Sequence, residues 1–397
     1  MDDVLVIGAG PAGSRFAGMM AKEGYSVRVL EEHNRAGDGV CCTGIIGREC
    51  LNMVASEVKV LRPARSAVFV SPSGKTIRLE KDSPQAYVLD RAQLDRSMAE
   101  QAESDGAEFV FGCHVETAVT VNGHVEVHAL RNGTSAVFWA RVIALASGFS
   151  PGLSERLGFD SAGDFAVGAQ AEVEIQGDYE VEVRFSRRLA PGFFTWLVPT
   201  TGNRALVGLI CRRQSGRYLR AFLSQMEKEE KIRPGEPRIT YGRIPLKPVQ
   251  RSYADRMIAV GDAAGQVKPT TGGGIYYGFL CADIAAEVVG RALQADDLSR
   301  RRLAEYDRTW KKALQNEIRL GYLSRLVFER LSDSSIDELF DVVQAHALDK
   351  MALNLDGFSF DWHGGILSKA LSHPGVRGVL GVALKGLLSG KAEVALA

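Results

Sequence analysis

The chain has 397 residues, enough for about two or three domains and for the burial of a large cofactor. Its 48 lysines and arginines balance 48 aspartates and glutamates, so the overall charge gives no reason to expect nucleic acid or another polyanion as a partner. Six cysteines without paired metal-ligand spacing favour a reducing environment, and we expect no metal site. We also expect no signal peptide and no transmembrane helix, because the start lacks a basic segment and no uncharged apolar run reaches about 18 residues.

The beginning of the chain predicts a βαβ unit. An apolar strand over 4–7, a helix over 11–22 and a second strand over 26–30 follow one another. The intervening "GAGPAG" has the G-x-G-x-x-G spacing, and the second strand ends on two carboxylates, where dinucleotide-binding folds hold an adenosine ribose. The predicted contacts with a dinucleotide are Gly8, Gly10, Pro11, Ala12, Gly13, Glu31 and Glu32.

The following segments alternate between short strands and single helices. A glycine- and cysteine-rich loop over 33–44 leads to a short helix near Ile46, and "SPSG" at 71–74 marks a hairpin turn. The further elements that the pattern predicts are strands over 108–112, 115–121, 125–130, 137–145 and 257–260, an antiparallel sheet over 165–244, and helices over 91–103, 218–228 and beyond 274.

This interleaving predicts an α/β protein with a discontinuous Rossmann-type domain, an inserted antiparallel-sheet substrate domain and a helical C-terminal region. The dinucleotide-binding domain is expected over 1–63, 89–163 and 249–298. The substrate domain is expected over 64–88 and 164–248, and the helical region over 299–397.

The segment "MIAVGDAAGQVKPTTGGGI" resembles the second flavin-binding motif of the p-hydroxybenzoate hydroxylase superfamily. The resemblance implies FAD, with the aspartate bonding the ribityl chain and the glycine-rich turn approaching the isoalloxazine. A flat ring needs backbone without side chains against it, and the next helix N-terminus stabilises negative charge on the reduced flavin. Other matches follow the family order, although Ser147 stands where an acid or threonine is usual. The implied FAD contacts are Arg91, Val115, Ala146, Gly148, Gly261, Asp262, Pro269, Gly272, Gly273, Gly274 and Ile275.

Two local features resemble the geranylgeranyl reductase family of this superfamily. "GVCCTGIIG" matches its cysteine-small-glycine loop best at Cys42, with Cys41 as the other register. "FTWLVP" matches its aromatic-x-Trp-x-x-Pro strand, which lines the substrate tunnel, but starts with phenylalanine where tyrosine is common. The first position therefore has no hydroxyl to donate a proton. The candidate substrate contacts, which include two tyrosines after the glycine-rich turn, are Phe194, Trp196, Pro199, Tyr276 and Tyr277.

The family resemblance implies saturation of isolated double bonds in a geranylgeranyl or other polyprenyl chain of a lipid, diphosphate, pigment or quinone. Such an alkene has no carbonyl to hold negative charge, so a proton must arrive before or together with hydride from reduced flavin N5. The resulting cationic carbon requires an apolar, water-poor cavity with aromatic faces. Cys42, or a water beside it, is the candidate proton donor, with Cys41 as the alternative.

Two other functions stay open on the sequence alone: a flavin monooxygenase or halogenase, and an electron-transfer flavoprotein that passes electrons to quinone. No second glycine fingerprint indicates a nicotinamide domain, so the electron donor is NADPH, NADH or reduced ferredoxin. The apolar segment 375–391 predicts either peripheral contact with the inner face of the membrane or a helix packed over the tunnel. We expect a cytoplasmic protein whose partners are a prenyl lipid or prenyl diphosphate and a ferredoxin-type donor.

Overall fold

The computed structural model describes residues 1–54, 58–160, 163–354 and 359–388. By compactness the chain divides into two units. The first unit consists of Met1–Val60, Leu89–Phe165 and Arg243–Ile318, and the second of Leu61–Val88, Ala166–Gly242 and Arg319–Ala397. Each unit is assembled from separate stretches of the chain, as expected where one domain is inserted into another.

An eight-stranded sheet forms the centre of the first unit. Its strands are β1 (Asp2–Ile7), β2 (Val27–Leu30), β8 (Glu108–Val110), β9 (Cys113–Val121), β10 (His124–Arg131), β11 (Thr134–Leu145), β17 (Tyr253–Ala254) and β18 (Met257–Ala259). The order is β17-β18-β11-β1-β2-β8, and β10 and then β9 continue antiparallel from β11. β1 pairs in parallel with both β2 and β11, which is the arrangement of a Rossmann-type sheet.

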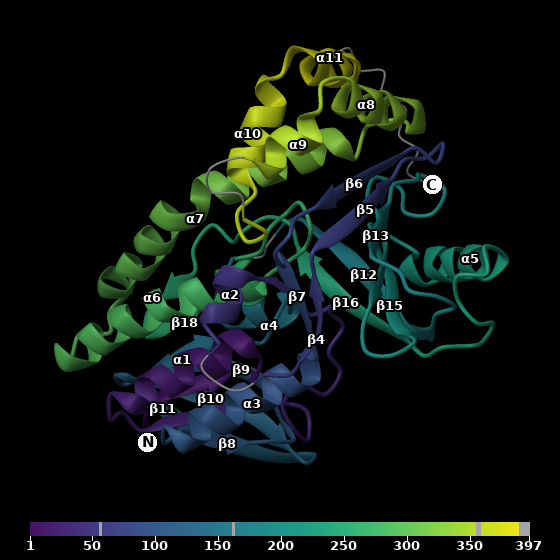
Figure 1. Ribbon diagram of the computed structural model, residues 1–397. Coiled ribbons are helices and arrows are strands. Elements are labelled where there is room, and N and C mark those ends of the chain that lie inside the picture. Colours follow the sequence, from purple (N-terminus) through teal and green to yellow (C-terminus); the bar gives the residue numbers. More distant parts are fainter. Residues whose placement is uncertain (55–57, 161–162, 355–358, 389–397) are drawn as a thin grey trace. The chain divides into compact units, whose positions relative to one another are not determined.

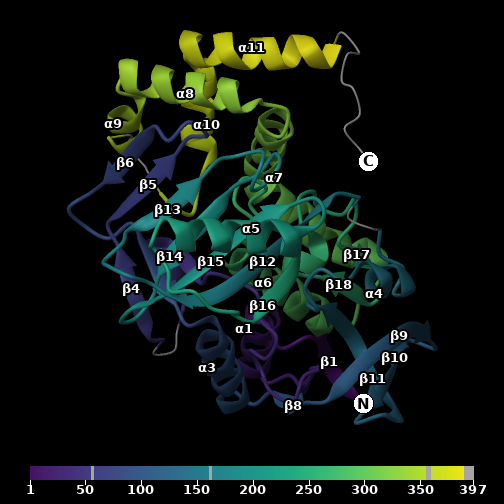
Figure 2. The ribbon, with the colours of Figure 1, turned by 90° about the vertical axis from the view of Figure 1, so that its right-hand side faces the viewer.

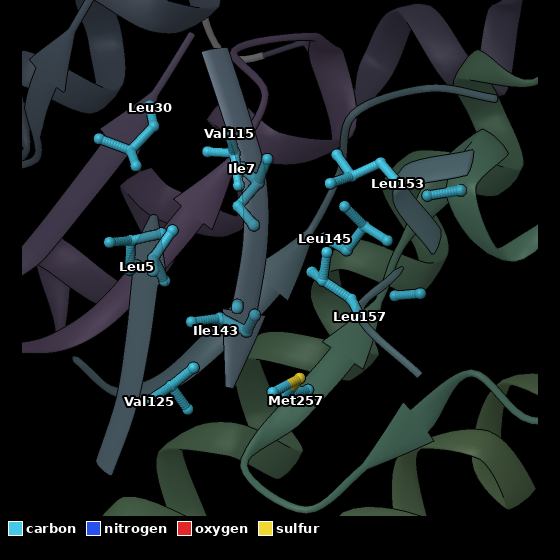
Figure 3. Close-up of a cluster of buried hydrophobic side chains, with 14 of the residues drawn as sticks. Leu5, Ile7, Leu30, Val115, Val125, Ile143, Leu145, Leu153, Leu157 and Met257 are labelled. Atoms are coloured by element: carbon cyan, nitrogen blue, oxygen red, sulfur yellow. The ribbon is translucent and has the colours of Figure 1, made fainter. Parts of the chain in front are cut away.

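Val4–Ile7 of β1 are buried, with both faces of the strand covered, which explains why these four residues are all apolar. Besides the first part of α7, described below, the described helices of the first unit are α1 (Pro11–Lys22), α2 (Arg48–Asn52), α3 (Arg91–Ser104), α4 (Pro151–Arg156) and α6 (Ile275–Gln294), with a 3-10 helix η1 (Gly261–Ala264) and a short strand β3 (Ile45–Gly47). α1 packs between α3 and α6 and against β1 (Figure 1). Leu5 and Ile7 belong to a separate buried cluster with side chains from β9, β10 and α4 (Figure 3).

The second unit is built on a seven-stranded sheet in the order β16-β12-β15-β14-β13-β5-β6. Its strands are β5 (Ser66–Val70), β6 (Thr76–Glu80), β12 (Phe165–Glu174), β13 (Val181–Arg184), β14 (Thr195–Pro199), β15 (Arg204–Cys211) and β16 (Ile239–Pro245). β4 (Val60–Ala64) and β7 (Ala86–Leu89) lie where the chain passes from one unit to the other. β12, β15, β14 and β13 pair antiparallel, whereas β13 pairs in parallel with β5, which comes from an earlier stretch of the chain. α5 (Ser215–Lys228) packs on β15 and covers one face of the sheet (Figure 2).

Helices make up the rest of the described chain. They are α7 (Arg300–Phe328), α8 (Asp333–Ala345), α9 (Leu348–Leu353), α10 (Gly364–Ser372) and α11 (Pro374–Leu388). α8 packs on β6 and α11, and Asp337 of α8 accepts hydrogen bonds from Ser71 and Ser73 in the hairpin turn. None of the described helices combines the length and the apolar character needed to cross a bilayer.

The structure confirms the predicted fold class, the βαβ start and the hairpin at "SPSG". The helix expected near Ile46 begins at Arg48, because Ile45–Gly47 are extended as β3. The helices expected as a region of their own over 299–397 divide between the two units after Ile318.

Candidate active site

The turn between β1 and α1 has three glycines in different surroundings. Gly8 has φ +106°, a conformation that favours glycine, and a Cβ there would lie 2.6 Å from the Ala146 carbonyl oxygen. A Cβ at Gly13 would lie 2.2 Å from the Gly8 oxygen, so α1 packs directly on the turn. A Cβ at Gly10 would meet nothing within 4 Å. Gly8 and Gly13 therefore shape the turn, while the open space at Gly10 fits a pyrophosphate at the start of α1.

Two carboxylates follow β2, and only Glu31 is buried at this turn, since Glu32 is exposed. The Ala9 N–H donates to Glu31 Oε2 over 2.8 Å, and the His33 N–H donates to Oε1 over 2.9 Å. His33 Nδ1 lies 2.6 Å from the same Oε1, and Glu32 Oε2 lies 3.0 Å from His114 Nδ1. A carboxylate accepts about four hydrogen bonds, so Glu31 keeps capacity for a ribose hydroxyl.

The loop after β11 lies against the end of β1, since the Ala146 N–H donates to the Ile7 oxygen over 2.8 Å. Ser147 Oγ is buried and has no hydrogen-bond partner among the described residues. Such an orphaned polar atom fits a site that a ligand completes. Gly148 has φ +67° with open space beside it. The Val115 side chain lies in the core cluster, so only its backbone is left to meet an adenine.

The second flavin motif meets α1 and α6 within the first unit. A Cβ at Gly261 would lie 3.1 Å from Cβ of Ala12, next to Pro11 at the start of α1. A Cβ at Gly274 would lie 2.5 Å from Asp262 Oδ1, which places this carboxylate at the start of α6. Burial raises the pKa of Asp262 to about 6, against the opposing charge of Arg91. The carboxyl is therefore able to accept or, when protonated, donate a hydrogen bond to a ribityl hydroxyl.

A buried chain of hydrogen bonds holds this loop in place. The Gly261 N–H donates to Gln266 Oε1 over 2.7 Å, Gln266 Nε2 donates to Tyr306 Oη over 2.8 Å, and Tyr306 Oη donates to the Ala259 oxygen over 3.0 Å. Burial raises the pKa of Tyr306 well above its usual value, so the hydroxyl stays protonated. Tyr306 belongs to α7 and is not among the predicted site residues, because no local sequence pattern signals such a contact.

The glycine-rich turn before α6 closes over a lysine. Lys268 is 5% exposed; its N–H donates to the Gly273 oxygen over 3.0 Å, and its oxygen accepts from the Gly272 N–H over 2.8 Å. A Cβ at Gly273 would lie 3.0 Å from Lys268 Cε. Pro269 is buried in this turn, and Ile275 begins α6. Lys268 is not among the residues predicted from the sequence, although a lysine within a glycine-rich motif is a visible signal.

The cysteine loop packs on the start of α3. Gly44 has φ +68°, and a Cβ there would lie 2.2 Å from the Leu89 oxygen. The Gly44 N–H donates to Cys42 Sγ at 3.4 Å. Arg91 Nη2 donates to both Asp95 oxygens over 2.9 and 3.1 Å. Burial lowers the pKa of Arg91, but its interactions with Asp95 and the Cys42 side chain raise it overall, so the guanidinium stays charged beside the sulfur.

Exposure distinguishes Cys41 and Cys42 from the other cysteines. Both are partly exposed, whereas the other four are buried. Tyr276 and Tyr277, in the first turn of α6, are buried with ring centroids 6.2 Å apart, and Tyr276 Oη donates to Glu49 Oε2 over 2.8 Å. Each of these side chains belongs to the first unit.

The predicted tunnel strand is β14, in the second unit. The ring centroids of Phe194 and Trp196 lie 6.0 Å apart, and Pro199 is buried at the end of the strand. Trp196 is paired with Gly208 of β15, where a Cβ would lie 2.5 Å from Trp196 Cζ2. The indole therefore lies across a position without a side chain. Trp196 Nε1 is buried without a hydrogen-bond partner among the described residues.

The residues of the first unit fit FAD. They provide open space at Gly10, a carboxylate at Glu31, the orphaned Ser147 hydroxyl and a side-chain-free turn over 272–274 beside Asp262. Fold and site together define a flavin-dependent oxidoreductase.

Comparison with known proteins agrees with this class. Residues 53–320 match the family described as Tryptophan halogenase, and residues 6–44 match the NAD(P)-binding Rossmann-like domain. The digeranylgeranylglycerophospholipid reductase of Methanothrix thermoacetophila is 30% identical over 369 residues, which cover 88% of this chain and 93% of the relative. The reductase of the same name from Methanocaldococcus jannaschii is 29% identical over 353 residues, covering 86% and 90%.

Solved structures share the fold. A protein described as geranylgeranyl bacteriochlorophyll reductase-like, from Thermoplasma acidophilum, has a TM-score of 0.84 at 22% identity, covering 96% of this chain and 99% of that chain. Halogenase PltM in complex with phloroglucinol and FAD has a TM-score of 0.68 at 14% identity, covering 98% and 92%. The chain belongs to the geranylgeranyl reductase family of FAD-dependent oxidoreductases and to the group that the tryptophan halogenase profile describes. The predicted cofactor FAD and the predicted enzyme class are thereby confirmed.

Proposed function

We propose that the protein reduces isolated double bonds in the geranylgeranyl chains of a glycerophospholipid. The observation that carries this proposal is the 30% identity over 93% of the Methanothrix relative, whose name states that substrate. The cysteine loop at Cys42 and the strand motif from Trp196 to Pro199 support the same chemistry. A prenyl diphosphate, pigment or quinone would present the same chain on another carrier, and these are the substrates to compare.

Reduced FAD, when bound, supplies the hydride for this reaction. The chain's own residues hold the cofactor and supply the rest: Gly10 and Glu31 bind its pyrophosphate and adenosine ribose, and Asp262 bonds the ribityl hydroxyls. The glycine-rich turn at 272–274 keeps side chains away from the ring. The N-terminus of α6 favours negative charge nearby.

The protein must also deliver a proton to the alkene. Cys42, or a water held beside it, is the proposed donor, because the residue is partly exposed and its sulfur is fixed by the Gly44 N–H and by Arg91. A thiol is poorly matched in acidity to an alkene, so the reaction needs further stabilisation of the cationic carbon. The proposed source is the aromatic faces of Phe194 and Trp196, which also exclude water.

Mass spectrometry tests the proposal directly. FAD-loaded protein is reduced with dithionite under anaerobic conditions and incubated with a digeranylgeranylglycerophospholipid, geranylgeranyl diphosphate, and a prenylated pigment or quinone. A gain of about two daltons for each double bond reduced is the expected result, largest for the glycerophospholipid. Fully reduced protein that leaves every prenyl substrate unchanged would refute the proposal.

The match to the tryptophan halogenase family favours a second candidate function, an oxygen-dependent monooxygenase or halogenase. The two chemistries differ in what they consume. A halogenase requires oxygen and halide, whereas alkene reduction proceeds without either. Product that forms only in the presence of oxygen, or that carries bromine in bromide buffer, would establish the second candidate.

The electron donor and the membrane contact belong to the same proposal. NADPH, NADH and reduced ferredoxin are compared by the rate at which each reduces the bound flavin.

We propose that α11 (Pro374–Leu388) makes peripheral contact with the inner face of the membrane. The helix is apolar, and the proposed substrate of the protein is a lipid. Flotation with liposomes of wild-type protein, but not of a truncation before Gly375, is the expected result.

A further inference from the structure

Cys41 and Cys42 are adjacent in the chain, and neither forms a disulfide. Both residues are partly exposed, whereas the other four cysteines are buried, so a small oxidant in water reaches this pair most readily. The proposed reaction needs one of the two thiols as a proton donor. The second thiol therefore has no role in it, although it lies next to the first.

Hydrogen-bond donors lie around the sulfur of Cys42. The Gly44 N–H donates to Cys42 Sγ over 3.4 Å, and the charged guanidinium of Arg91 interacts with the same side chain. Donors of this kind stabilise a sulfur that has lost its proton. The proposed proton transfer leaves Cys42 in that state, and the thiolate is the form of cysteine that peroxides oxidise.

The spacing of adjacent residues determines the properties of a disulfide between them. Consecutive Cα atoms lie about 3.8 Å apart, whereas the Cα atoms of a disulfide are usually about 4.4–6.8 Å apart. A disulfide between Cys41 and Cys42 is therefore strained, and strained disulfides are easily reduced. Such a bond suits reversible oxidation better than permanent cross-linking, in agreement with the reducing environment that the cysteine content favours.

We propose that Cys41 and Cys42 form a site of reversible oxidation, which hydrogen peroxide converts to a disulfide and a thiol reductant restores. The Cys42 thiolate first attacks one peroxide oxygen: an S–O bond forms, the O–O bond breaks, and the departing hydroxide takes up the proton that the thiol released. The Cys41 sulfur then attacks the resulting sulfenic acid, which forms the S–S bond and releases water. The two thiols thus lose two electrons and two protons, and the peroxide becomes two molecules of water.

Oxidation of the pair has a consequence for the proposed reaction. A sulfur in a disulfide carries no proton, so Cys42 would stop supplying one to the alkene. This consequence rests on the proposed function, whereas the existence of the oxidation site does not. The experiment therefore measures the state of the cysteines and the turnover separately.

Trypsin separates the pair from every other cysteine of the chain. Cleavage after Arg35 and Arg48 releases a peptide over 36–48 that contains Cys41 and Cys42 alone, while Cys50 falls in the peptide over 49–59. Folded, FAD-loaded protein is treated with hydrogen peroxide, unfolded in the presence of N-ethylmaleimide to label the remaining thiols, digested, and analysed by mass spectrometry. A parallel sample receives dithiothreitol after the peroxide, and both samples are assayed for alkene reduction before labelling.

After peroxide, we expect the peptide over 36–48 to carry no label and to weigh about two daltons less than its dithiol form. Dithiothreitol should restore both labels. Alkene reduction should fall in proportion to the fraction of disulfide and return with the labels. In Cys41→Ala the second thiol is missing, so peroxide should carry Cys42 on to the sulfinic acid, a gain of about 32 daltons that dithiothreitol does not remove. Cys113→Ala is the control, because it replaces a buried cysteine of the same unit and should leave the oxidation of the pair unchanged.

Three results would overturn the proposal: a peptide over 36–48 that keeps both labels after peroxide, one that becomes linked through Cys50 to the peptide over 49–59, and one whose oxidation dithiothreitol does not reverse in wild type. If wild type reduces no prenyl substrate, the proposed function fails instead, and the peptide masses still decide whether the site exists. A reversible disulfide that leaves alkene reduction intact would confirm the site and exclude Cys42 as the proton donor.

Discussion

Replacing Gly10 with alanine should separate folding of the protein from binding of its cofactor. Gly10 has φ −71° and ψ 176°, which alanine adopts without strain, and the added Cβ meets nothing within 4 Å. Without FAD, the free energy of unfolding should therefore change by less than about 1 kcal/mol, and toward stability, because alanine restricts the unfolded chain. With FAD, the methyl group occupies the space assigned to the pyrophosphate. Forcing a methyl group into a packed contact costs about 1–3 kcal/mol, or about 5-fold to 150-fold in affinity.

The assay is a titration of apoprotein with FAD, followed by flavin fluorescence, alongside thermal unfolding of the same apoprotein. Gly13→Ala provides the contrast, because its Cβ would lie 2.2 Å from the Gly8 oxygen and should destabilise the fold itself. Gly235→Ala is the matched control, since a Cβ there also meets nothing within 4 Å but the residue lies in the second unit. If Gly10→Ala bound FAD as tightly as wild type, the assignment of the pyrophosphate to this turn would be refuted.

Three further predictions concern the loop that holds Asp262 and the separate loop that holds Cys41 and Cys42. Tyr306→Phe leaves Gln266 Nε2 without its acceptor, so urea unfolding should show a loss of about 1–3 kcal/mol and FAD titration a weaker affinity; an unchanged unfolding curve would contradict this. Because burial raises the pKa of Asp262 from 3.8 to about 6, the folded apoprotein binds a proton that the unfolded chain releases. The fold of wild type therefore gains stability as the pH falls from about 6 to about 4, and in denaturant titrations its free energy of unfolding should rise over that range relative to that of Asp262→Asn; a constant offset between the two proteins speaks against the buried carboxyl. Cys42→Ala should abolish alkene reduction with FAD content intact while Cys41→Ala remains active, and full turnover in both variants would disprove a role for the cysteines.

Local chemistry explains why much of the fold was predictable. The strand over 4–7 ends at a glycine that needs positive φ, and the helix after it begins with proline, so the βαβ start is encoded in adjacent residues. The hairpin at 71–74 is encoded in its turn residues in the same way. The first glycine motif is predicted from its spacing and the second from its resemblance to a flavin-binding motif, and the structure brings Gly261 to Ala12.

Contacts between distant segments explain what was missed. Tyr306 reaches the flavin loop from a helix far along the chain, and its position in α7 looks like an ordinary apolar face. β13 and β5 pair in parallel although no turn connects them, so no turn sequence predicts this pairing. Arg325 looks like one basic residue of a helix in the sequence, and only the structure shows its burial against the rings of Phe193 and Phe328.

The absence of a side chain at Gly208 determines how closely the Trp196 indole packs on the sheet, and so affects the width of the proposed prenyl site. Because residue 208 has no side chain, the Trp196 indole rests on the backbone of β15, and any larger residue there would push the ring off the sheet. A substitution at residue 208 would thus change the space beside Trp196, and with it the width of the proposed prenyl site, without altering a residue of the proposed wall.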